Sequence, residues 1–234
     1  MCGRFGATFT FREIIVRWNL QRDIPMYAPR FNIAPSQQVP VIVSTDSAPD
    51  AKGMQWGLVP WWAKDPAIGN RMINARAETL TEKGAFKNLV DKRRCLVPAD
   101  GFYEWRQEGK RKVPMWFYLR GTEPFAFAGL WDLWRKPDGS NLETFTIVTT
   151  EPNELMRPVH NRMPVILRRE DEEQWLDVSR AQFDKARSVL KPYPAQLMDA
   201  HNVSTIVNKP ENDTPECIER LSHSETLTPQ LSLL

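Results

Sequence analysis

RCLVPADGFYEWRQEGKRKVPMWFYLRGTEPFAFAGLW, residues 94–131, is the stretch that indicates the fold class most directly. It contains short runs rich in β-branched and aromatic residues, each bounded by Pro, Gly or Asp, which is typical of strands. The runs are Cys95–Val97, Phe102–Trp105, Met115–Leu119 and Phe125–Trp131. Because no segment of helical periodicity separates them, the stretch lacks the regular strand–helix alternation of a doubly wound α/β fold.

The rest of the chain adds further strands and several helices. The other strand-like runs are Val39–Val43, Met54–Val59, Thr144–Thr149 and Pro164–Leu167. Helical periodicity is clearest over Phe11–Trp18, Ala75–Glu82, Asn153–Val159, Glu170–Leu176 and Ser179–Leu190. Thr10 and Ser179 are candidate N-caps, and Glu13 completes a capping-box pattern with Thr10. These patterns predict an α+β fold: a mostly antiparallel, barrel-like β core with peripheral helices in a single domain.

The composition is that of an ordinary globular protein. The 234 residues are 41% hydrophobic and 26% charged, and no apolar run approaches the roughly 20 residues that span a bilayer. No apolar leader follows Met1, and the three cysteines and three histidines show no metal-site or redox spacing. We therefore expect a cytoplasmic protein with reduced thiols, no metal, no cofactor and no membrane partner. We expect a domain over residues 1–210 and a polar, partly mobile tail over residues 211–234.

The net charge of +2 conceals a difference between the two halves of the chain. Residues 1–120 carry 19 Lys and Arg against 11 Asp and Glu, whereas residues 121–234 carry 12 against 18. Such an asymmetry is a recognised sign of a polyanion partner. The alternative is that the halves fold together and their charges intermix.

Cys2 is the first candidate for chemistry. Removal of Met1 would leave an N-terminal cysteine, whose amine has a reference pKa of about 7.7–8.0, far below a lysine's ~10.4, so much more of it is neutral and nucleophilic near pH 7. The amine can condense with an aldehyde to a Schiff base, and the adjacent thiol can then close a thiazolidine ring at high effective concentration. The alternative is a small, buried and inert cysteine.

Two polar motifs could assist such chemistry. Asn74 and Arg76 fall at a predicted loop-to-helix boundary, where Asn74 could simply cap the helix. Arg76 would oppose the helix dipole in the first turn, a small penalty that an anionic ligand would cancel. Glu104 lies in a predicted strand and faces away from Tyr103 and Trp105. Its aromatic surroundings predict desolvation, a raised pKa and proton transfer near neutral pH; the alternative is a solvent-facing strand glutamate.

A histidine and an aromatic pair complete the set of candidates. His160 follows a predicted helix and precedes Arg162 and a strand, where it could be either catalytic or structural. Trp61 and Trp62 lie in a Pro-stiffened loop of the basic half, and basic residues interleaved with aromatic ones suit single-stranded nucleic acid. We expect Trp56 in the core, and one member of the Trp61–Trp62 pair buried with the other exposed.

Seven motifs in a fixed order resemble one known family. They are Met1-Cys2-Gly3-Arg4-Phe5, Asn32-Ile33-Ala34-Pro35, Trp56-Gly57-Leu58-Val59-Pro60, Asn74-Ala75-Arg76-Ala77-Glu78, Arg94-Cys95-Leu96-Val97-Pro98, Gly101-Phe102-Tyr103-Glu104-Trp105 and His160-Asn161-Arg162-Met163-Pro164. From residue 2 to about residue 210, the chain resembles the SOS-response-associated peptidase (SRAP) family of abasic-site processing proteins. The resemblance implies a compact α+β fold with a barrel-like sheet and a positively charged groove for single-stranded DNA.

The resemblance also implies roles for individual residues. After removal of Met1, Cys2 would form a thiazolidine crosslink with the ring-opened aldehyde of an abasic site. Asn74 would orient the Cys2 amine or the sugar, Glu104 would handle protons during ring opening and Schiff-base formation, and His160 would donate or accept a proton in ring closure or reversal. The residues expected to contact DNA are Arg4, Arg76 and Arg162, on phosphates, and Trp61 or Trp62, by stacking.

The favoured function is therefore a DNA-damage protein that captures abasic sites in single-stranded DNA and shields them. Schiff-base chemistry would also permit a weak lyase activity, and the family name suggests peptidase activity in removing Met1. We expect a monomer that associates with the nucleoid during DNA damage if the source is bacterial. The alternatives are a cysteine peptidase with Cys2 as nucleophile and His160 as base, and a non-catalytic single-strand binding module.

Overall fold

A closed barrel of five strands forms the centre of the structure, a computed structural model that describes residues 2–20, 27–45, 48–121, 123–178 and 183–221. Its strands are β3 (Gln38–Val43), β4 (Asp50–Trp56), β6 (Arg94–Ala99), β9 (Phe125–Arg135) and β10 (Asn141–Thr150). They pair in the order β4-β3-β6-β9-β10, and β10 pairs with β4 to close the ring. Only the β10–β4 contact within this ring is parallel. The predicted fold class is confirmed.

Three short strands extend the barrel beside β9 and β10. β5 (Asn74–Arg76) runs parallel to β10, β11 (Met163–Pro164) runs antiparallel to β10, and β12 (Ile166–Leu167) runs antiparallel to β9. Thr149 of β10 is thus paired with Arg76 on one side and Pro164 on the other. The end of β10 therefore brings together two motifs that lie far apart in the sequence.

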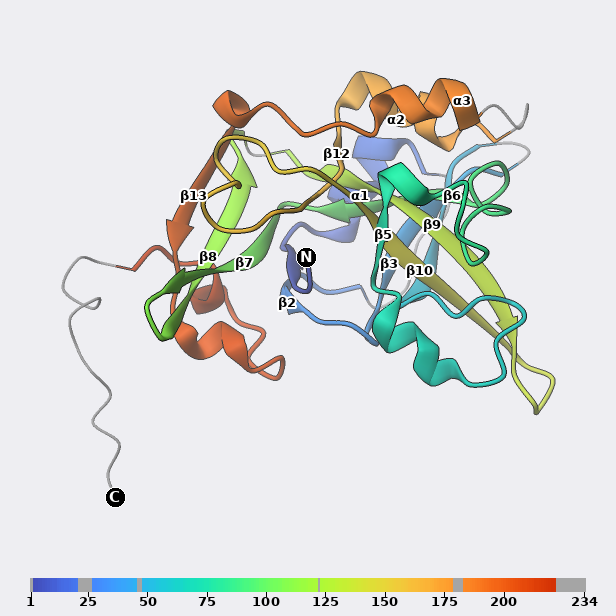
Figure 1. The fold of residues 1–234 in the computed structure, drawn as a ribbon, viewed down its shortest axis with the longest axis horizontal. Helices are drawn as coiled ribbons and strands as arrows, with labels where there is room; N and C mark the ends of the chain where they lie inside the picture. The colour runs from blue at the N-terminus through green and yellow to red at the C-terminus, as the bar shows by residue number, and fades with distance from the viewer. Residues whose placement is uncertain (1, 21–26, 46–47, 122, 179–182, 222–234) are drawn as a thin grey trace.

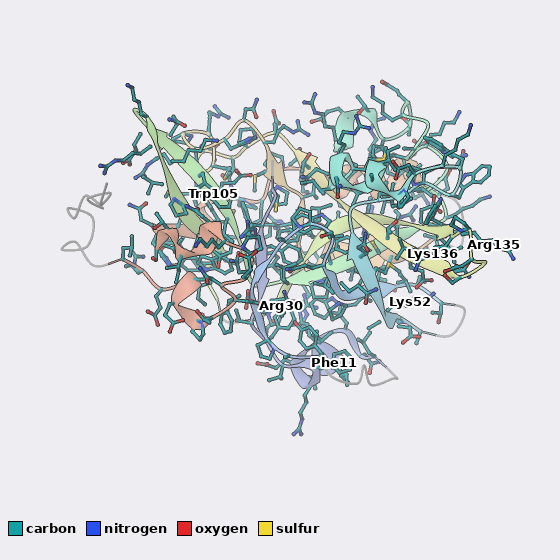
Figure 2. The ribbon with its side chains drawn as sticks, turned by 90° about the horizontal axis from the view of Figure 1, so that it is seen from below. Phe11, Arg30, Lys52, Trp105, Arg135 and Lys136 are labelled. Carbon is teal, nitrogen blue, oxygen red and sulfur yellow. The ribbon has the colours of Figure 1, made fainter. Side chains whose placement is uncertain are left out.

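A second, antiparallel sheet lies against the barrel. Its strands are β1 (Phe5–Ala7), β2 (Arg30–Ile33), β7 (Gly101–Glu108), β8 (Arg111–Leu119) and β13 (Met198–Asn202). They are ordered β13-β8-β7-β1-β2. The start of the chain lies between this sheet and the barrel, near the middle of the molecule (Figure 1). This sheet also carries Trp105 and Arg30, whereas Lys52, Arg135 and Lys136 lie at the other end of the molecule (Figure 2).

The hydrophobic core joins the two sheets through β1. The Phe5 ring packs edge-on against Trp56 of β4 and Phe127 of β9, with ring centroids 5.1 and 5.8 Å apart. A smaller cluster on the far face of the second sheet contains Tyr103, Trp116 and Cys217. The first residues of the chain are therefore fixed between two packed layers.

Helices are few and peripheral. They are α1 (Phe11–Trp18), α2 (Arg169–Leu176) and α3 (Phe183–Ala186), with 3₁₀ turns η1 (Pro66–Arg71), η2 (Ala77–Thr79), η3 (Arg187–Val189), η4 (Ala195–Leu197), η5 (Thr205–Asn208) and η6 (Pro215–Cys217). The predicted capping box of α1 is present: Glu13 N–H donates to Thr10 Oγ1, and the Thr10 N–H donates to the Glu13 carboxylate at 2.6 Å. In the described part of the chain, no helix is long and apolar enough to cross a membrane.

Some predicted elements are wrong in detail. The expected helix Ala75–Glu82 begins instead as strand β5, because β10 offers it a partner, and continues as the turn η2. The expected helix Asn153–Val159 is a series of turns; Pro158 lacks the N–H that would bond to the carbonyl four residues earlier. The run Met54–Val59 ends as a strand at Trp56, and Pro164–Leu167 is divided into β11 and β12.

The last predicted helix and the tail are only partly described. Ser179 lies outside the described residues, and the expected Ser179–Leu190 helix contributes α3 and η3. Residues 211–221 pack on β2, where the Asp213 carboxylate accepts the N–H groups of Phe31 and Asn32 at 2.5 and 2.8 Å. Residues 222–234 lie outside the described part.

Candidate functional site

Cys2 is fully buried between the two sheets and is held from β5. Asn74 Nδ2 donates to the Cys2 carbonyl oxygen at 2.8 Å, and Cys2 Sγ lies 3.9 Å from the Arg4 carbonyl oxygen, to which it donates. Burial, together with the negative charge of Glu104, raises the pKa of the Cys2 thiol far above its ordinary value. The thiol is therefore neutral at physiological pH, and a reaction that needs the thiolate requires a nearby base.

Glu104 reaches this site from β7. Phe102 pairs with Phe5, and the Tyr103 N–H donates to Arg4 O at 2.9 Å, which places Glu104 beside the first residues of the chain. The side chain is only 5% exposed, whereas Tyr103 packs in the cluster on the opposite face. The prediction of a strand glutamate that is buried and faces away from Tyr103 is confirmed.

Asn74 is a strand residue and does not cap a helix. Its Nδ2 donates to the Cys2 carbonyl oxygen, while its Oδ1 is buried without a hydrogen-bond partner in the described part of the chain. The sequence predicted Arg76 in the first turn of a helix, and this prediction is wrong. Arg76 lies at the end of β5 and is exposed. The structure thus gives Asn74 a direct contact with Cys2 and leaves the Arg76 guanidinium in solvent.

His160 and Arg162 approach the same end of β10. The Arg162 N–H donates to His160 Nδ1 at 3.0 Å, so the neutral imidazole carries its proton on Nε2. The Arg162 guanidinium donates to both carboxylate oxygens of Glu78 at 2.8 Å and to the Thr149 carbonyl at 2.7 Å. These bonds lower the pKa of Glu78. Glu78, which the sequence motif includes but which was assigned no role, orients Arg162.

Arg4 points into the layer beneath the C-terminal segment. Its NH1 donates to Asn32 Oδ1 at 2.7 Å and to the Val207 carbonyl at 2.6 Å, and its guanidinium lies 5.9 Å from the Trp105 ring centroid. Asn32 is fully buried, and its Nδ2 donates to carbonyls of the C-terminal segment: Val207, Lys209 and Asn212. Arg4 and Asn32 therefore join the start of the chain to its end.

The tryptophans differ from the expectation in one respect. Trp56 is 1% exposed, as predicted for a core residue. Trp61 and Trp62 are 66% and 48% exposed, so the expectation that one of the pair is buried is wrong. The backbone of this loop is bonded to the barrel, which allows both indole rings to remain in solvent.

Ion pairs connect the basic and acidic halves of the chain. Cations of the first half pair with carboxylates of the second in Arg17–Glu172, Arg30–Asp213, Lys52–Glu143 and Arg93–Asp132. Lys64, Arg71 and Arg76 are exposed near the aromatic pair and β5 in the sequence. The charges therefore intermix at these pairs, while part of the positive charge remains at the surface.

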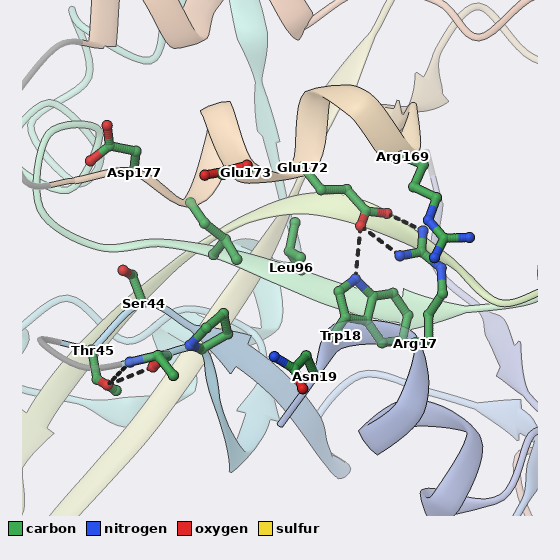
Figure 3. A pocket seen from close by; sticks show the side chains of 13 residues that line it. Arg17, Trp18, Asn19, Ser44, Thr45, Leu96, Arg169, Glu172, Glu173 and Asp177 are labelled. Atoms are coloured by element: carbon green, nitrogen blue, oxygen red, sulfur yellow. Dashed lines mark hydrogen bonds and ion pairs between the residues drawn. The ribbon is translucent and has the colours of Figure 1, made fainter. Parts of the chain in front are cut away.

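A cavity of about 590 Å³ lies between α1 and α2, apart from these residues. Figure 3 shows its wall, where Glu172 accepts hydrogen bonds from Arg17 and from the Trp18 indole. None of the predicted site residues lines it. The Glu172 carboxylate joins the two helices, and neither Cys2 nor Asn74 nor Glu104 lines this cavity.

Comparison with known proteins gives consistent results. Residues 1–210 match the family described as SOS response associated peptidase (SRAP). The chain is 47% identical over 222 residues to "Abasic site processing protein YoqW" of Bacillus subtilis, covering 94% of this chain and 99% of that protein. It is 35% identical over 224 residues to "Abasic site processing protein HMCES" of Gallus gallus, covering 82% of this chain and 66% of that protein.

A solved structure shows the same fold. The crystal structure of a protein from Bacteroides thetaiotaomicron matches with a TM-score of 0.86 at 30% sequence identity. The match covers 94% of this chain and 100% of that chain. The overall fold is thus shared across the matched length.

Proposed function

The chain belongs to the SOS response associated peptidase (SRAP) family, and on that premise we propose that it captures abasic sites in single-stranded DNA through a covalent bond to Cys2. The observation that carries the proposal is the enclosed Cys2, bonded to Asn74 and close to the Glu104 carboxylate. The names of the YoqW and HMCES relatives, which describe abasic site processing, support the same substrate.

The reaction begins once Met1 has been removed and Cys2 carries a free amine. A ring-opened abasic site presents an aldehyde, which the amine attacks; loss of water then gives a Schiff base. The Cys2 thiol adds to the same carbon, and its proton passes to the nitrogen as the thiazolidine closes. Aldehyde and aminothiol thus combine with release of one water, without an oxidant or a reductant.

The surrounding side chains fit the proton transfers that this sequence requires. The Cys2 thiol holds its proton strongly, so closure needs a base, and Glu104 is buried beside it. His160, with Nδ1 occupied by the Arg162 N–H, offers the proton on Nε2. Asn74 fixes the Cys2 carbonyl and thereby the direction of the amine.

The DNA strand would contact the groups around this centre. Arg76 and Arg162 are suited to phosphates next to the lesion, and Glu78 holds the Arg162 fork in place before DNA arrives. Trp61 and Trp62 offer exposed rings for bases next to the gap left by the missing base. Arg4 acts mainly by holding the start of the chain, although part of its charge faces the Trp105 ring.

The test is intact mass measurement before and after exposure to single-stranded DNA that carries one abasic site. We expect the mature protein to lack Met1 and to gain the mass of the DNA less one water. Cys2→Ala, or a chain that retains Met1, should gain no mass. A covalent product of equal yield with Cys2→Ala would contradict the proposal.

A cysteine peptidase with Cys2 as nucleophile and His160 as base is the second candidate, and the family description supports it. The Cys2 thiol donates to the Arg4 carbonyl oxygen in the structure, and a peptidase would need His160 to take that proton and leave a thiolate. Turnover on unrelated polypeptides would favour the peptidase. Loss of Met1 that depends on Glu104 or His160, measured by mass, would instead indicate self-processing only.

A further inference from the structure

The loop that carries the aromatic pair is closed at its base, directly before Asn74. Gly57 and Gly69 approach so closely that a Cβ on either would lie 2.7 Å from the carbonyl oxygen of the other. The Leu58 N–H donates to Met72 O at 3.1 Å, and the Trp56 indole donates to Ile73 O at 2.9 Å. The loop therefore leaves the barrel and returns at one point, adjacent to the strand that holds Cys2.

Between these ends, barrel side chains hold the loop backbone at three points. The Trp61 N–H donates to Asp132 Oδ2 at 2.9 Å, and the Trp134 indole donates to the Ala63 carbonyl at 2.7 Å. The Val59 N–H donates to Thr144 Oγ1 at 2.8 Å. Asp132 and Trp134 come from β9, and Thr144 from β10. The residues on either side of the indole pair are thus fixed, while the rings themselves stay exposed.

Asp132 is the least expected member of this set. It is only 2% exposed, and burying a carboxylate is costly unless its oxygens are bonded. Its Oδ1 accepts the Leu133 N–H at 2.8 Å and lies 3.5 Å from Arg93 NH1, while its Oδ2 accepts the Trp61 N–H of the loop. A buried carboxylate that gives one of its two oxygens to a backbone N–H of a solvent-exposed loop points to a need for that loop to have one conformation.

We propose that Asp132 is a positioning residue that, together with Trp134, holds Trp61 and Trp62 ready to stack on the bases beside an abasic site. This rests on the proposed function, in which the aromatic pair contacts the DNA strand. A stacking surface that is ordered before binding loses less conformational entropy when the strand arrives. Asp132 thus acts on affinity for DNA through the loop, without touching the DNA or the reacting atoms.

The experiment is single-turnover crosslinking of labelled abasic DNA at increasing protein concentration. It yields the half-saturating concentration and the maximal rate separately. Replacing both rings, W61A/W62A, should raise the half-saturating concentration roughly 10-fold, in keeping with the usual cost of losing stacking. Asp132→Ala should raise it about 3- to 10-fold, since the loop N–H loses its charged acceptor. Asp132→Ala should leave the maximal rate unchanged, because Asp132 touches neither the DNA nor the reacting atoms.

A combined variant shows whether Asp132 acts through the rings. D132A added to W61A/W62A should cause no further rise, because the loop then carries nothing to position. A further rise in the combined variant, or an unchanged value for D132A alone beside a raised one for W61A/W62A, overturns the inference. If W61A/W62A itself has no effect, the stacking role and this inference both fail, while capture by Cys2 is tested separately by Cys2→Ala.

A second pair of variants keeps the inference testable if D132A does not fold. Trp134→Phe removes the indole N–H that holds Ala63, together with part of the ring, and should raise the half-saturating concentration about 2- to 3-fold. Trp175→Phe is the matched control, because it makes the same change at another buried tryptophan, whose indole N–H is bonded to Cys95 O on the α2 side of the barrel. Equal values for the two variants would count against a positioning role.

Discussion

Glu104 and Cys2 lie close enough inside the protein for the carboxylate to oppose ionisation of the thiol. The same proximity makes Glu104 the natural recipient of the thiol proton when that thiol adds to a Schiff base. Asn74 contributes no charge, but its amide N–H fixes the Cys2 carbonyl, and its own oxygen is buried without a hydrogen-bond partner among the described residues. The chemistry thus depends on a few side chains held from separate strands.

Glu104→Gln is the sharpest test of this arrangement. The substitution keeps the shape and removes the proton acceptor, so the maximal crosslinking rate should fall roughly 100-fold, the lower end of the usual range for acid–base catalysis. Single-turnover rates at saturating DNA measure the effect. Glu108→Gln, an exposed glutamate on the same strand, is the matched control and should leave the rate unchanged. A Glu104→Gln rate within about twofold of the wild type would contradict the role.

Sequence reasoning succeeded for some of these residues and missed others for a physical reason. The burial of Glu104 could be predicted because a strand alternates its faces and its neighbours are aromatic. The roles of Asn32 and Asp132 could not, because their partners are contributed by distant segments: the C-terminal carbonyls for Asn32 and the Trp61 N–H for Asp132. The role of such a buried polar residue can be inferred only once the tertiary structure shows which distant segments it bonds to.

Among the elements, the strands of residues 94–131 were predictable because turn residues delimit each of them. β5 was not, since its three residues form a strand only where β10 pairs with them. The α1 helix was predicted to its exact bounds because its cap and its apolar face agree. Short elements that form only by pairing with a neighbouring strand, such as β5 and β13, could not be predicted from the local sequence pattern.

The loop closure at Gly57 makes a prediction about stability. Gly57 has φ +116°, and an added Cβ would also meet Gly69 O, so Gly57→Ala should lower the free energy of unfolding by about 3 kcal/mol or more. Gly139→Ala has φ +85° with open space around the added Cβ, and should cost only about 1 kcal/mol. Denaturant unfolding compares the two. Equal losses would show that the close approach of the loop ends is unimportant.

Across the whole molecule, carboxylates in the second half of the sequence form ion pairs with some of the cations in the first half and so partly neutralise its positive charge. Arg76 is exposed at the end of β5, the strand that holds Cys2, and the Arg162 guanidinium donates to the Thr149 carbonyl of the neighbouring β10. Reversible affinity for single-stranded DNA should therefore be modest, and lasting attachment has to come from the covalent bond. This agrees with a net charge of only +2.

The salt dependence of reversible binding measures how many phosphates are engaged. With two or three contacts, the slope of log K against log salt for Cys2→Ala and abasic single-stranded DNA should be about −1.5 to −2. The crosslink formed by the mature protein should survive high salt unchanged. A slope steeper than about −4 would mean that a far larger basic surface binds the strand.

The enclosure of Cys2 also sets an order of events in the life of the chain. Its neighbours Asn74 and Glu104 are made well after it, and at roughly 5–20 residues per second the strand carrying Glu104 leaves the ribosome several seconds or more behind the first residue. A separate aminopeptidase can reach the Met1–Cys2 bond freely during that interval, before the two sheets close over Cys2. Once the chain has folded, Cys2 is fully buried, so we expect Met1 to be removed faster during synthesis than from the folded protein.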